Sequence, residues 1–316
     1  MRRIQFIELH EQPWCPSSVR NGITDALQFG FNLLGAYAPI APLLQDALDC
    51  SGSGSIVDLC SGAGGPWSKL FRKLRSLKPD GNPAGLQIWL TDKYPNPGAV
   101  RNIFTGNQVR CYPGSVDATK VPEDLKGLRT MFTSFHHFPP EQARAILQNA
   151  VDAGEGIGIF EIPRRAPLTI ALTFAFVLML IVCTPCFRPF RWSRLLWTFV
   201  IPIVPFILLF DGVVSCLRAY RPQELREMIG KLAANDYVWE TGEHSSGRLP
   251  ITYLLGYPRA VGPSRARLEQ PGARFLRKIE RSPDKKLSLC ASLVNWKRVR
   301  RRCNSGVRVW AHRSIP

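Results

Sequence analysis

Short apolar segments alternate with segments of helical periodicity along much of the chain, and this alternation restricts it to few folds. The expected strands are 55–60, 86–91, 109–113, 129–134, 156–162, 237–241 and 251–256. The clearest expected helices are 66–77, 140–153 and 222–234. Strands that alternate with helices form βαβ units, whose strands lie parallel in one sheet with helices on both faces. The sequence therefore predicts an α/β fold with about seven mostly parallel strands.

A strongly apolar stretch interrupts this pattern after the fifth strand. Residues 166–187 contain no charged side chain, and residues 195–217 contain only Asp211. At ~1.5 Å per residue, ~20 helical residues cover the ~30 Å hydrocarbon layer of a membrane, so both runs are long enough to be membrane helices. Pro202 and Pro205 would kink the second run. The sequence thus predicts an apolar helical hairpin inserted at 166–217.

The rest of the chain divides around the sheet and this insertion. Residues 1–48 are predicted to form an N-terminal helical cap, because apolar residues recur there at helical spacing. The sheet domain is expected at 49–165 and 218–258. Residues 259–316 hold 16 of the 41 Lys and Arg residues but 3 of the 24 Asp and Glu residues, and we expect this basic tail to be disordered. Any argument for nucleic acid binding therefore concerns the tail alone.

Nine cysteines are scattered along the chain without a secretory signal pattern before them, which favours a reducing cytoplasmic setting. Cys183 and Cys186 form a CxxC pair that has no second pair of ligands. Burial as small apolar side chains accounts for them without a metal ion. The sequence predicts no metal site.

The most informative segment joins the first expected strand to the first helix of the sheet domain. The strand contains Asp58, and a turn with Gly62, Gly64 and Gly65 follows before the helix begins. Glycine permits positive φ and lets the backbone approach a ligand, while the N-terminus of the next helix offers unpaired N–H groups. This pattern indicates a loop for a nucleotide-like cofactor. It lacks the GxGxxG spacing of dinucleotide loops and the lysine of a P-loop.

This segment resembles the first motif of class I S-adenosylmethionine-dependent methyltransferases, in which an acid precedes a GxGxG-like loop. Asp58 stands in place of the acid, Gly62 and Gly64 match the last two glycines, and Cys60 stands where the first glycine is usual. The resemblance covers about 55–162 and 218–258. It implies a Rossmann-like methyltransferase sheet and S-adenosyl-L-methionine as the cofactor. The stretches 58–66, 91–96, 134–138 and 187–195 are also similar to a bacterial branch of this family with a hydrophobic insertion.

The resemblance further implies which side chains hold the cofactor. Asp92, at the end of the second strand, looks like the acid that accepts hydrogen bonds from the ribose hydroxyls. Asp117 and Ala118 resemble the pair beside the adenine amino group. The predicted cofactor-binding residues are Asp58, Cys60, Gly62, Gly64, Gly65, Asp92, Lys93, Asp117, Ala118 and Ser134.

Strand four ends in Thr-Ser-Phe-His-His-Phe at 133–138, similar to the Ser-x-x-His-His endings of many small-molecule methyltransferases. A histidine can remove the proton of an acceptor hydroxyl or acidic carbon, so His137 and its neighbour His136 are the candidate catalytic residues. Adjacent strand residues face opposite sides, so we expect at most one of them to point at the methyl group. The Asp/Asn-Pro-Pro-aromatic element is missing here, which counts against DNA adenine and protein glutamine as acceptors.

The insertion leaves the sheet beside the expected cofactor, because ligands of such sheets bind at the carboxyl ends of the strands. Full membrane crossing would place Arg188, Arg191 and Arg194 on the far side, against the bias of positive loops to stay inside. A shallow hairpin on the cytoplasmic side of a bacterial membrane, with Trp192 and Trp197 at headgroup depth, avoids this conflict. We therefore expect a methyltransferase that acts on a hydrophobic small molecule or a lipid.

Other interpretations stay open at this stage. A nucleic-acid methyltransferase guided by the basic tail is one, although we expect no nucleic acid partner for the rest of the chain. A membrane-associated scaffold that keeps the fold without catalysis is another, and Cys60 is its main support. Buried helices or a dimer interface would also explain the apolar runs. The sequence leaves the acceptor atom, the depth of the hairpin and the oligomeric state undetermined.

Overall fold

The computed structural model describes residues 1–77, 85–95, 108–188, 190–234, 236–245 and 250–259. They belong to one compact unit, residues 1–261. Apart from Arg259, the basic tail predicted at 259–316 lies outside the described residues.

Seven strands form one sheet in the order β3-β2-β1-β4-β5-β7-β6. They are β1 (Ser55–Asp58), β2 (Gln87–Leu90), β3 (Val109–Cys111), β4 (Leu128–Phe132), β5 (Ile157–Glu161), β6 (Tyr237–His244) and β7 (Ile251–Pro258). Strands β1 to β5 run parallel, whereas β7 is antiparallel to both β5 and β6. The predicted sheet of about seven mostly parallel strands is confirmed, and each expected strand exists.

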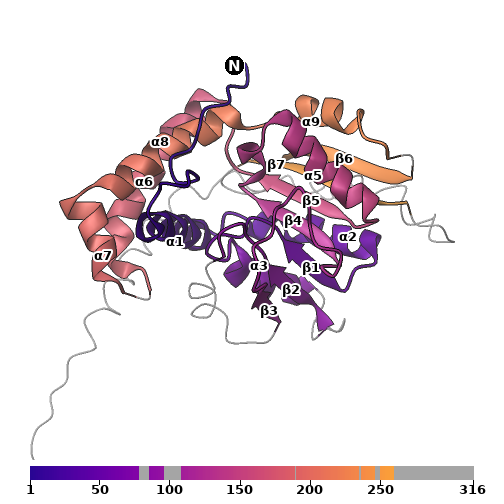
Figure 1. Ribbon diagram of the computed structural model, residues 1–316, viewed down its shortest axis with the longest axis horizontal. Coiled ribbons are helices and arrows are strands. Elements are labelled where there is room, and N and C mark those ends of the chain that lie inside the picture. Colours follow the sequence, from indigo (N-terminus) through magenta and orange to yellow (C-terminus); the bar gives the residue numbers. More distant parts are fainter. Residues whose placement is uncertain (78–84, 96–107, 189, 235, 246–249, 260–316) are drawn as a thin grey trace, which may run out of the picture. The chain divides into compact units, whose positions relative to one another are not determined.

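Helices cover both faces of this sheet (Figure 1). On one face, the short helix η1 (Ala38–Ile40), α2 (Ala41–Ser51) and α3 (Trp67–Leu77) pack against strand residues such as Ile56. On the other face, α5 (Pro140–Asp152) and α9 (Pro222–Ile229) pack against residues such as Val57. Ile56 and Val57 bury opposite faces because successive side chains of a strand alternate.

A separate group of helices forms from the N-terminus and the apolar insertion. It contains α1 (Ser17–Leu34), α6 (Pro167–Cys183), η4 (Thr184–Cys186), α7 (Trp192–Leu195) and α8 (Ile203–Arg218). In Figure 1, α1, α6, α7 and α8 lie together to the left of the sheet. They share an apolar core, whose buried members include Ile23, Val177, Leu180 and Ile207. The first helix of the predicted cap thus packs on the insertion, while α2 packs on the sheet.

The second apolar run is divided by a break. A π-helical turn, η5 (Leu196–Val200), continues α7, and the axis then bends by 73° before α8. Pro202 lies at the bend, and Pro205 lies in the first turn of α8, where a missing N–H removes no helical hydrogen bond. By length and composition, one helix in the described part, Pro167–Cys186, could cross a membrane, or up to three if each bent pair is one span.

The residues before α1 run along α8 (Figure 1). The backbone N–H of Ile4 donates to the carbonyl of Leu217 at 3.1 Å, and those of Leu9 and His10 donate to the carboxylate of Asp211 at 2.7 and 3.1 Å. Asp211 is the one charged residue of the second apolar run. Because its carboxylate binds the N-terminal segment, it does not face a hydrocarbon layer.

A buried ion pair joins α1 to the insertion, and its removal should destabilise the protein. Asp25 and Arg194 lie 2.7 Å apart, and the Arg194 side chain is 5% exposed. Asp25→Ala leaves this cation without its carboxylate, so we expect the free energy of unfolding to fall by roughly 3 kcal/mol in denaturant titration. The double variant Asp25→Ala/Arg194→Met should recover part of the loss, and Asp152→Ala on the exposed end of α5 is the control. A change no larger than that of the control would contradict a stabilising role for this pair.

Candidate functional site

The order of the strands places a ligand site at one edge of the sheet. Strand β1 lies between β2 and β4, so successive connections leave β1 and β4 in opposite directions along the sheet. In open α/β sheets, ligands bind at the carboxyl ends of the strands at such a switch point. The loop after β1 and the turn after β4 are therefore the places to search.

The loop after β1 holds four residues in the left-handed region. Cys60 has φ 57°, and Gly62, Gly64 and Gly65 have φ 55°, 101° and 49°. This backbone turns sharply between β1 and α3, and the N–H of Ser61 is fixed to the carbonyl of Thr91 at 2.9 Å. Cys60 thus has the backbone conformation that glycine favours at the position where the resemblance placed a glycine.

Asp58 joins this loop to β4. Its side chain is buried, and its two oxygens accept hydrogen bonds at 2.7 Å from the hydroxyls of Thr130 and Ser61. Burial raises the pKa of Asp58 to about 6, although those hydrogen bonds act in the opposite direction. Asp58 does not line the cavity described below, so its contacts connect β1, β4 and the loop.

Asp92, after β2, faces the same cavity as the loop. Its carboxylate accepts hydrogen bonds from the backbone N–H groups of Gly62 and Tyr94, both at 2.8 Å. Burial raises its pKa. Each carboxylate oxygen has room for a further hydrogen bond, so Asp92 can accept two hydroxyl donors while it holds both loops.

The structure brings most of the predicted site residues to one cavity. Those that line it are Cys60, Gly62, Gly65, Asp92, Lys93, Ser134, His136 and His137. Those that do not are Asp58, Gly64, Asp117 and Ala118. Asp117 is exposed, and its Oδ1 accepts hydrogen bonds from the backbone and hydroxyl of Thr119 at 2.8 and 2.7 Å.

The expectation that His136 and His137 face opposite sides is wrong. Strand β4 ends at Phe132, and the two histidines lie in the 3-10 turn η3 (Phe135–His137), where side chains no longer alternate. Their ring centroids are 4.3 Å apart, and both residues line the cavity, with the His136 side chain 1% exposed and that of His137 16% exposed.

Glu161, at the end of β5, fixes His136. The imidazole Nδ1 lies 2.5 Å from Glu161 Oε2, while Glu161 Oε1 accepts the backbone N–H groups of Ser134 and Phe135 at 2.9 and 2.8 Å. Burial would raise the pKa of Glu161, but His136 and these N–H donors outweigh it and lower the pKa. One carboxylate thus sets both the turn and the orientation of the buried His136 ring.

His137 faces carboxylates from the N-terminal segment. Its Nδ1 lies 3.2 Å from Glu8 Oε2 and also forms an ion pair with Glu11. Burial would lower the pKa of His137, but the two carboxylates raise it to about 9. The buried guanidinium of Arg218 approaches Glu8 at 3.3 Å and Glu11 at 3.1 Å, and it donates to the backbone carbonyls of His136 and His137.

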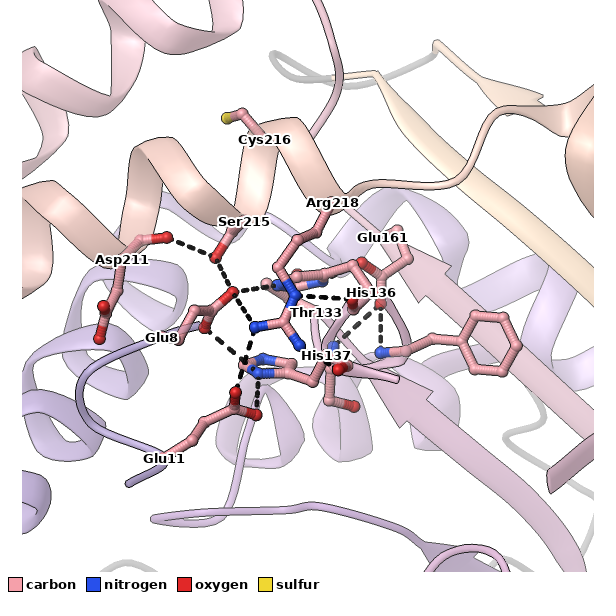
Figure 2. A network of polar contacts seen from close by, with 12 residues as sticks. Glu8, Glu11, Thr133, His136, His137, Glu161, Asp211, Ser215, Cys216 and Arg218 are labelled. Atoms are coloured by element: carbon pink, nitrogen blue, oxygen red, sulfur yellow. Dashed lines mark hydrogen bonds and ion pairs between the residues drawn. The ribbon is translucent and has the colours of Figure 1, made fainter. Parts of the chain in front are cut away.

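Figure 2 shows this polar network at the ends of β4 and β5, with side chains from the N-terminal segment and α8. Five members of the network were not predicted from the sequence, namely Glu8, Glu11, Glu161, Ser215 and Arg218. The sequence does contain an indication of some of them. Glu8, His10 and Glu11 lie close together before a helix, and Arg218 ends the apolar run. Their convergence depends on tertiary contacts that sequence spacing does not reveal.

The cavity has a volume of about 1190 Å³, which exceeds the ~300–1,000 Å³ typical of one small ligand. One part is lined by the loop after β1, Asp92 and the two histidines. Another part is lined by apolar side chains of α1 and α6, which include Leu27, Phe31, Leu172, Phe176 and Met179. The cavity therefore joins a polar region at the sheet to an apolar region at the insertion.

No family model matches the chain, and no curated protein matches its sequence. Among solved structures, human N-acetylserotonin methyltransferase in complex with S-adenosylmethionine is 16% identical, over 74% of this chain and 56% of that one, with a TM-score of 0.44. Magnesium protoporphyrin IX methyltransferase from Synechocystis is 13% identical, over 72% and 82%, with a TM-score of 0.38. A protein described as a Zn-dependent alcohol dehydrogenase from Rhodobacter sphaeroides is 13% identical, over 78% and 100%, with a TM-score of 0.44.

These structures are distant, and the chain spans about half the length of the human enzyme. The seven-stranded sheet and its two helical layers decide the class of the fold. The chain has an α/β Rossmann-like fold. Its candidate site lies where such folds bind ligands, at the carboxyl ends of β1 and β4.

The raised pKa of Asp58 predicts a pH dependence of stability. The folded protein holds this proton up to about pH 6, whereas the unfolded chain releases it near 3.8, so the free energy of unfolding falls between those values as pH rises. Asp58→Asn has no side chain that titrates in this range, so its free energy of unfolding should not show this fall. In urea titrations from pH 4 to 7, the free energy of unfolding of Asp58→Asn should therefore rise relative to that of the wild type by roughly 3 kcal/mol. Asp152→Asn on the exposed end of α5 should show no such trend, and a pH-independent difference for Asp58→Asn would refute the raised pKa.

Proposed function

We propose that this protein is an S-adenosylmethionine-dependent methyltransferase that acts on a hydrophobic or membrane-resident small molecule. The observation that supports this function best is the single cavity that contacts the glycine loop and Asp92 at one part and the apolar faces of α1 and α6 at another. A cofactor and an apolar acceptor would meet where these parts join, next to His136 and His137. Solved methyltransferase structures with bound S-adenosylmethionine are among those similar to this chain.

The residues at the polar part fit the proposed cofactor. S-adenosylmethionine supplies a methyl group on a positively charged sulfur. Asp92 can accept hydrogen bonds from two neighbouring ribose hydroxyls, and the left-handed backbone at Cys60 and Gly62 lets the loop approach a ligand closely. The carboxylates of Asp92, Glu8 and Glu11 line the cavity and favour a cationic ligand.

The other predicted cofactor contacts fall into two groups. Lys93, Ser134 and Gly65 line the cavity and remain candidates for direct contact. Asp117 and Ala118 follow β3 outside the cavity wall, and we propose them as neighbours of the adenine on the resemblance of the sequence alone.

The apolar part of the cavity is proposed to bind the acceptor. Phe31 from α1 and Phe176 from α6 stack there with ring centroids 5.5 Å apart, and both line the cavity. Such a lining removes apolar surface of an acceptor from water, at about 25 cal/mol per Å². We propose that His137 contacts the acceptor and orients its nucleophilic atom, while His136 is held by Glu161 and positions the turn. Methyl transfer needs such alignment, because the reaction is an in-line displacement.

A membrane surface is the proposed source of the acceptor. Large apolar side chains are exposed over the insertion, among them Leu178 at 63%, Trp192 at 77%, Val200 at 72% and Phe206 at 62%. Apolar patches of this kind mark membrane or protein contacts. Leu178 belongs to α6, which also lines the cavity, and this favours a bilayer, since an apolar molecule could pass from lipid to the site. We place the protein on the cytoplasmic side of a bacterial membrane.

The arginines of the insertion act differently from one another in this proposal. Arg188 is exposed and available to lipid phosphates, together with the exposed ring of Trp192. Arg194 is not available, because it is buried against Asp25. Fewer arginines of the hairpin are therefore available to lipid phosphates than was expected from the sequence.

Asp92 should be required for binding of the cofactor. We expect isothermal titration calorimetry with S-adenosylmethionine or S-adenosylhomocysteine to show saturable binding to the wild type, and Asp92→Ala to weaken it about 30-fold through loss of two charge-assisted hydrogen bonds. Asp117→Ala should have a smaller effect, since that carboxylate is exposed and already bonded to Thr119. Asp152→Asn is the matched control. Absence of binding to folded wild type would reject the methyltransferase and favour a scaffold.

Binding to lipid should depend on the exposed side chains of the insertion. In flotation with vesicles that contain phosphatidylethanolamine and phosphatidylglycerol, we expect the wild type to float with the lipid. The triple variant Trp192→Ser/Val200→Ser/Phe206→Ser should partition at least about tenfold more weakly, because three large apolar contacts with lipid are lost. Leu77→Ser, which removes an exposed apolar side chain of α3, is the control. Equal flotation of wild type and triple variant would reject the membrane proposal.

A further inference from the structure

Three side chains of types that can bind a metal ion converge at one wall of the cavity. Glu8 and His10 come from the N-terminal segment, and His137 comes from the turn after β4. Their ligand atoms all lie within 4.8 Å of one another. No metal site was predicted from the sequence, in which His137 lies far from Glu8 and His10.

The spacing of Glu8 and His137 suits a shared ion, and His10 lies slightly farther away. Glu8 Oε2 lies 3.2 Å from His137 Nδ1 and 3.9 Å from His10 Nδ1. Two ligands with metal bonds of ~2.0–2.2 Å are held roughly 3–3.6 Å apart at tetrahedral or octahedral angles. Glu8 Oε2 and His137 Nδ1 are buried and face each other, and the contacts of both atoms are ion pairs within this cluster. Buried polar atoms require partners, and an ion shared by the two atoms would supply one.

Further carboxylates surround the three ligands. Glu11 forms an ion pair with His137, and Asp211 Oδ2 lies 2.7 Å from His10 Nδ1. Both contacts are made to the Nδ1 atoms that face Glu8, so a metal ion bound there would displace the proton that each carboxylate now shares. Glu11 and Asp211 are therefore placed to become further ligands of the ion.

The charge of the cluster also favours a cation. Glu8, Glu11 and Asp211 are acidic and at least partly buried, and the guanidinium of Arg218 faces two of them. Protons on the histidines or a divalent ion at the same atoms would balance the remaining negative charge. Protons and metal compete for the ring nitrogens, so metal titration distinguishes the two states.

We infer that Glu8, His10 and His137 form a binding site for one divalent transition-metal ion, with Glu11 as a further ligand. Two imidazoles with carboxylates are a ligand set that suits Zn²⁺, Fe²⁺ and Mn²⁺ better than Ca²⁺ or Mg²⁺. The ion would join the N-terminal segment to the turn that carries both histidines. This inference does not depend on the proposed methyl transfer.

Direct metal binding tests the site. The full-length protein in mild detergent is treated with a chelator, and Zn²⁺ is then titrated in by calorimetry. We expect one ion per chain, and at least about tenfold weaker binding for His10→Gln and for Glu8→Gln. His10 is a suitable position because it belongs to none of the three apolar cores, so its replacement leaves them packed. His244→Gln, a histidine on β6 outside the cluster, should bind like the wild type.

Co²⁺ gives an independent readout of the ligands. Its visible absorption in the wild type should show a coordination sphere that contains imidazole, and His10→Gln should change or lose that spectrum. Zn²⁺ should also raise the melting temperature of the wild type and of His244→Gln more than that of His10→Gln. The inference is overturned if folded wild type takes up no Zn²⁺, or if His10→Gln and Glu8→Gln bind it as tightly as the wild type does.

Discussion

The guanidinium of Arg218 is the contact on which the arrangement of the site depends. It is buried at the end of α8, and it faces Glu8 and Glu11 while it donates to the backbone carbonyls of the turn after β4. A charge removed from water needs partners of this kind, and here they come from two other parts of the chain, the N-terminal segment and the turn after β4. One cation thus joins the N-terminal segment, the insertion and the sheet.

The sequence predicts the sheet well because strand and helix periodicity are local properties. Every expected strand exists, and loop residues such as Gly62 and Asp92 meet at one cavity. The polar network could not be predicted in the same way, since Glu8 and Arg218 acquire their roles only through tertiary contacts. The orientation of the two histidines was predicted wrongly because β4 ends at Phe132 and a 3-10 turn follows.

The carboxylates of Asp58 and Asp92 have different roles at the site. Asp58 is turned into the protein, where hydroxyls of β4 and the loop satisfy it. Asp92 uses backbone N–H groups of two loops and still faces the cavity. The acid of the glycine motif therefore shapes the loop, and the acid of the neighbouring strand is the one that can meet a ligand.

The insertion is built into the site at both of its ends. It leaves β5 just after Glu161, which holds His136, and it returns through Asp211, Ser215 and Arg218, which hold the N-terminal segment. Deletion of the apolar hairpin to obtain a water-soluble fragment would therefore also remove these contacts. A soluble form for crystallography is better sought by recoding the outward faces of α6 and α8 while their inward side chains are kept.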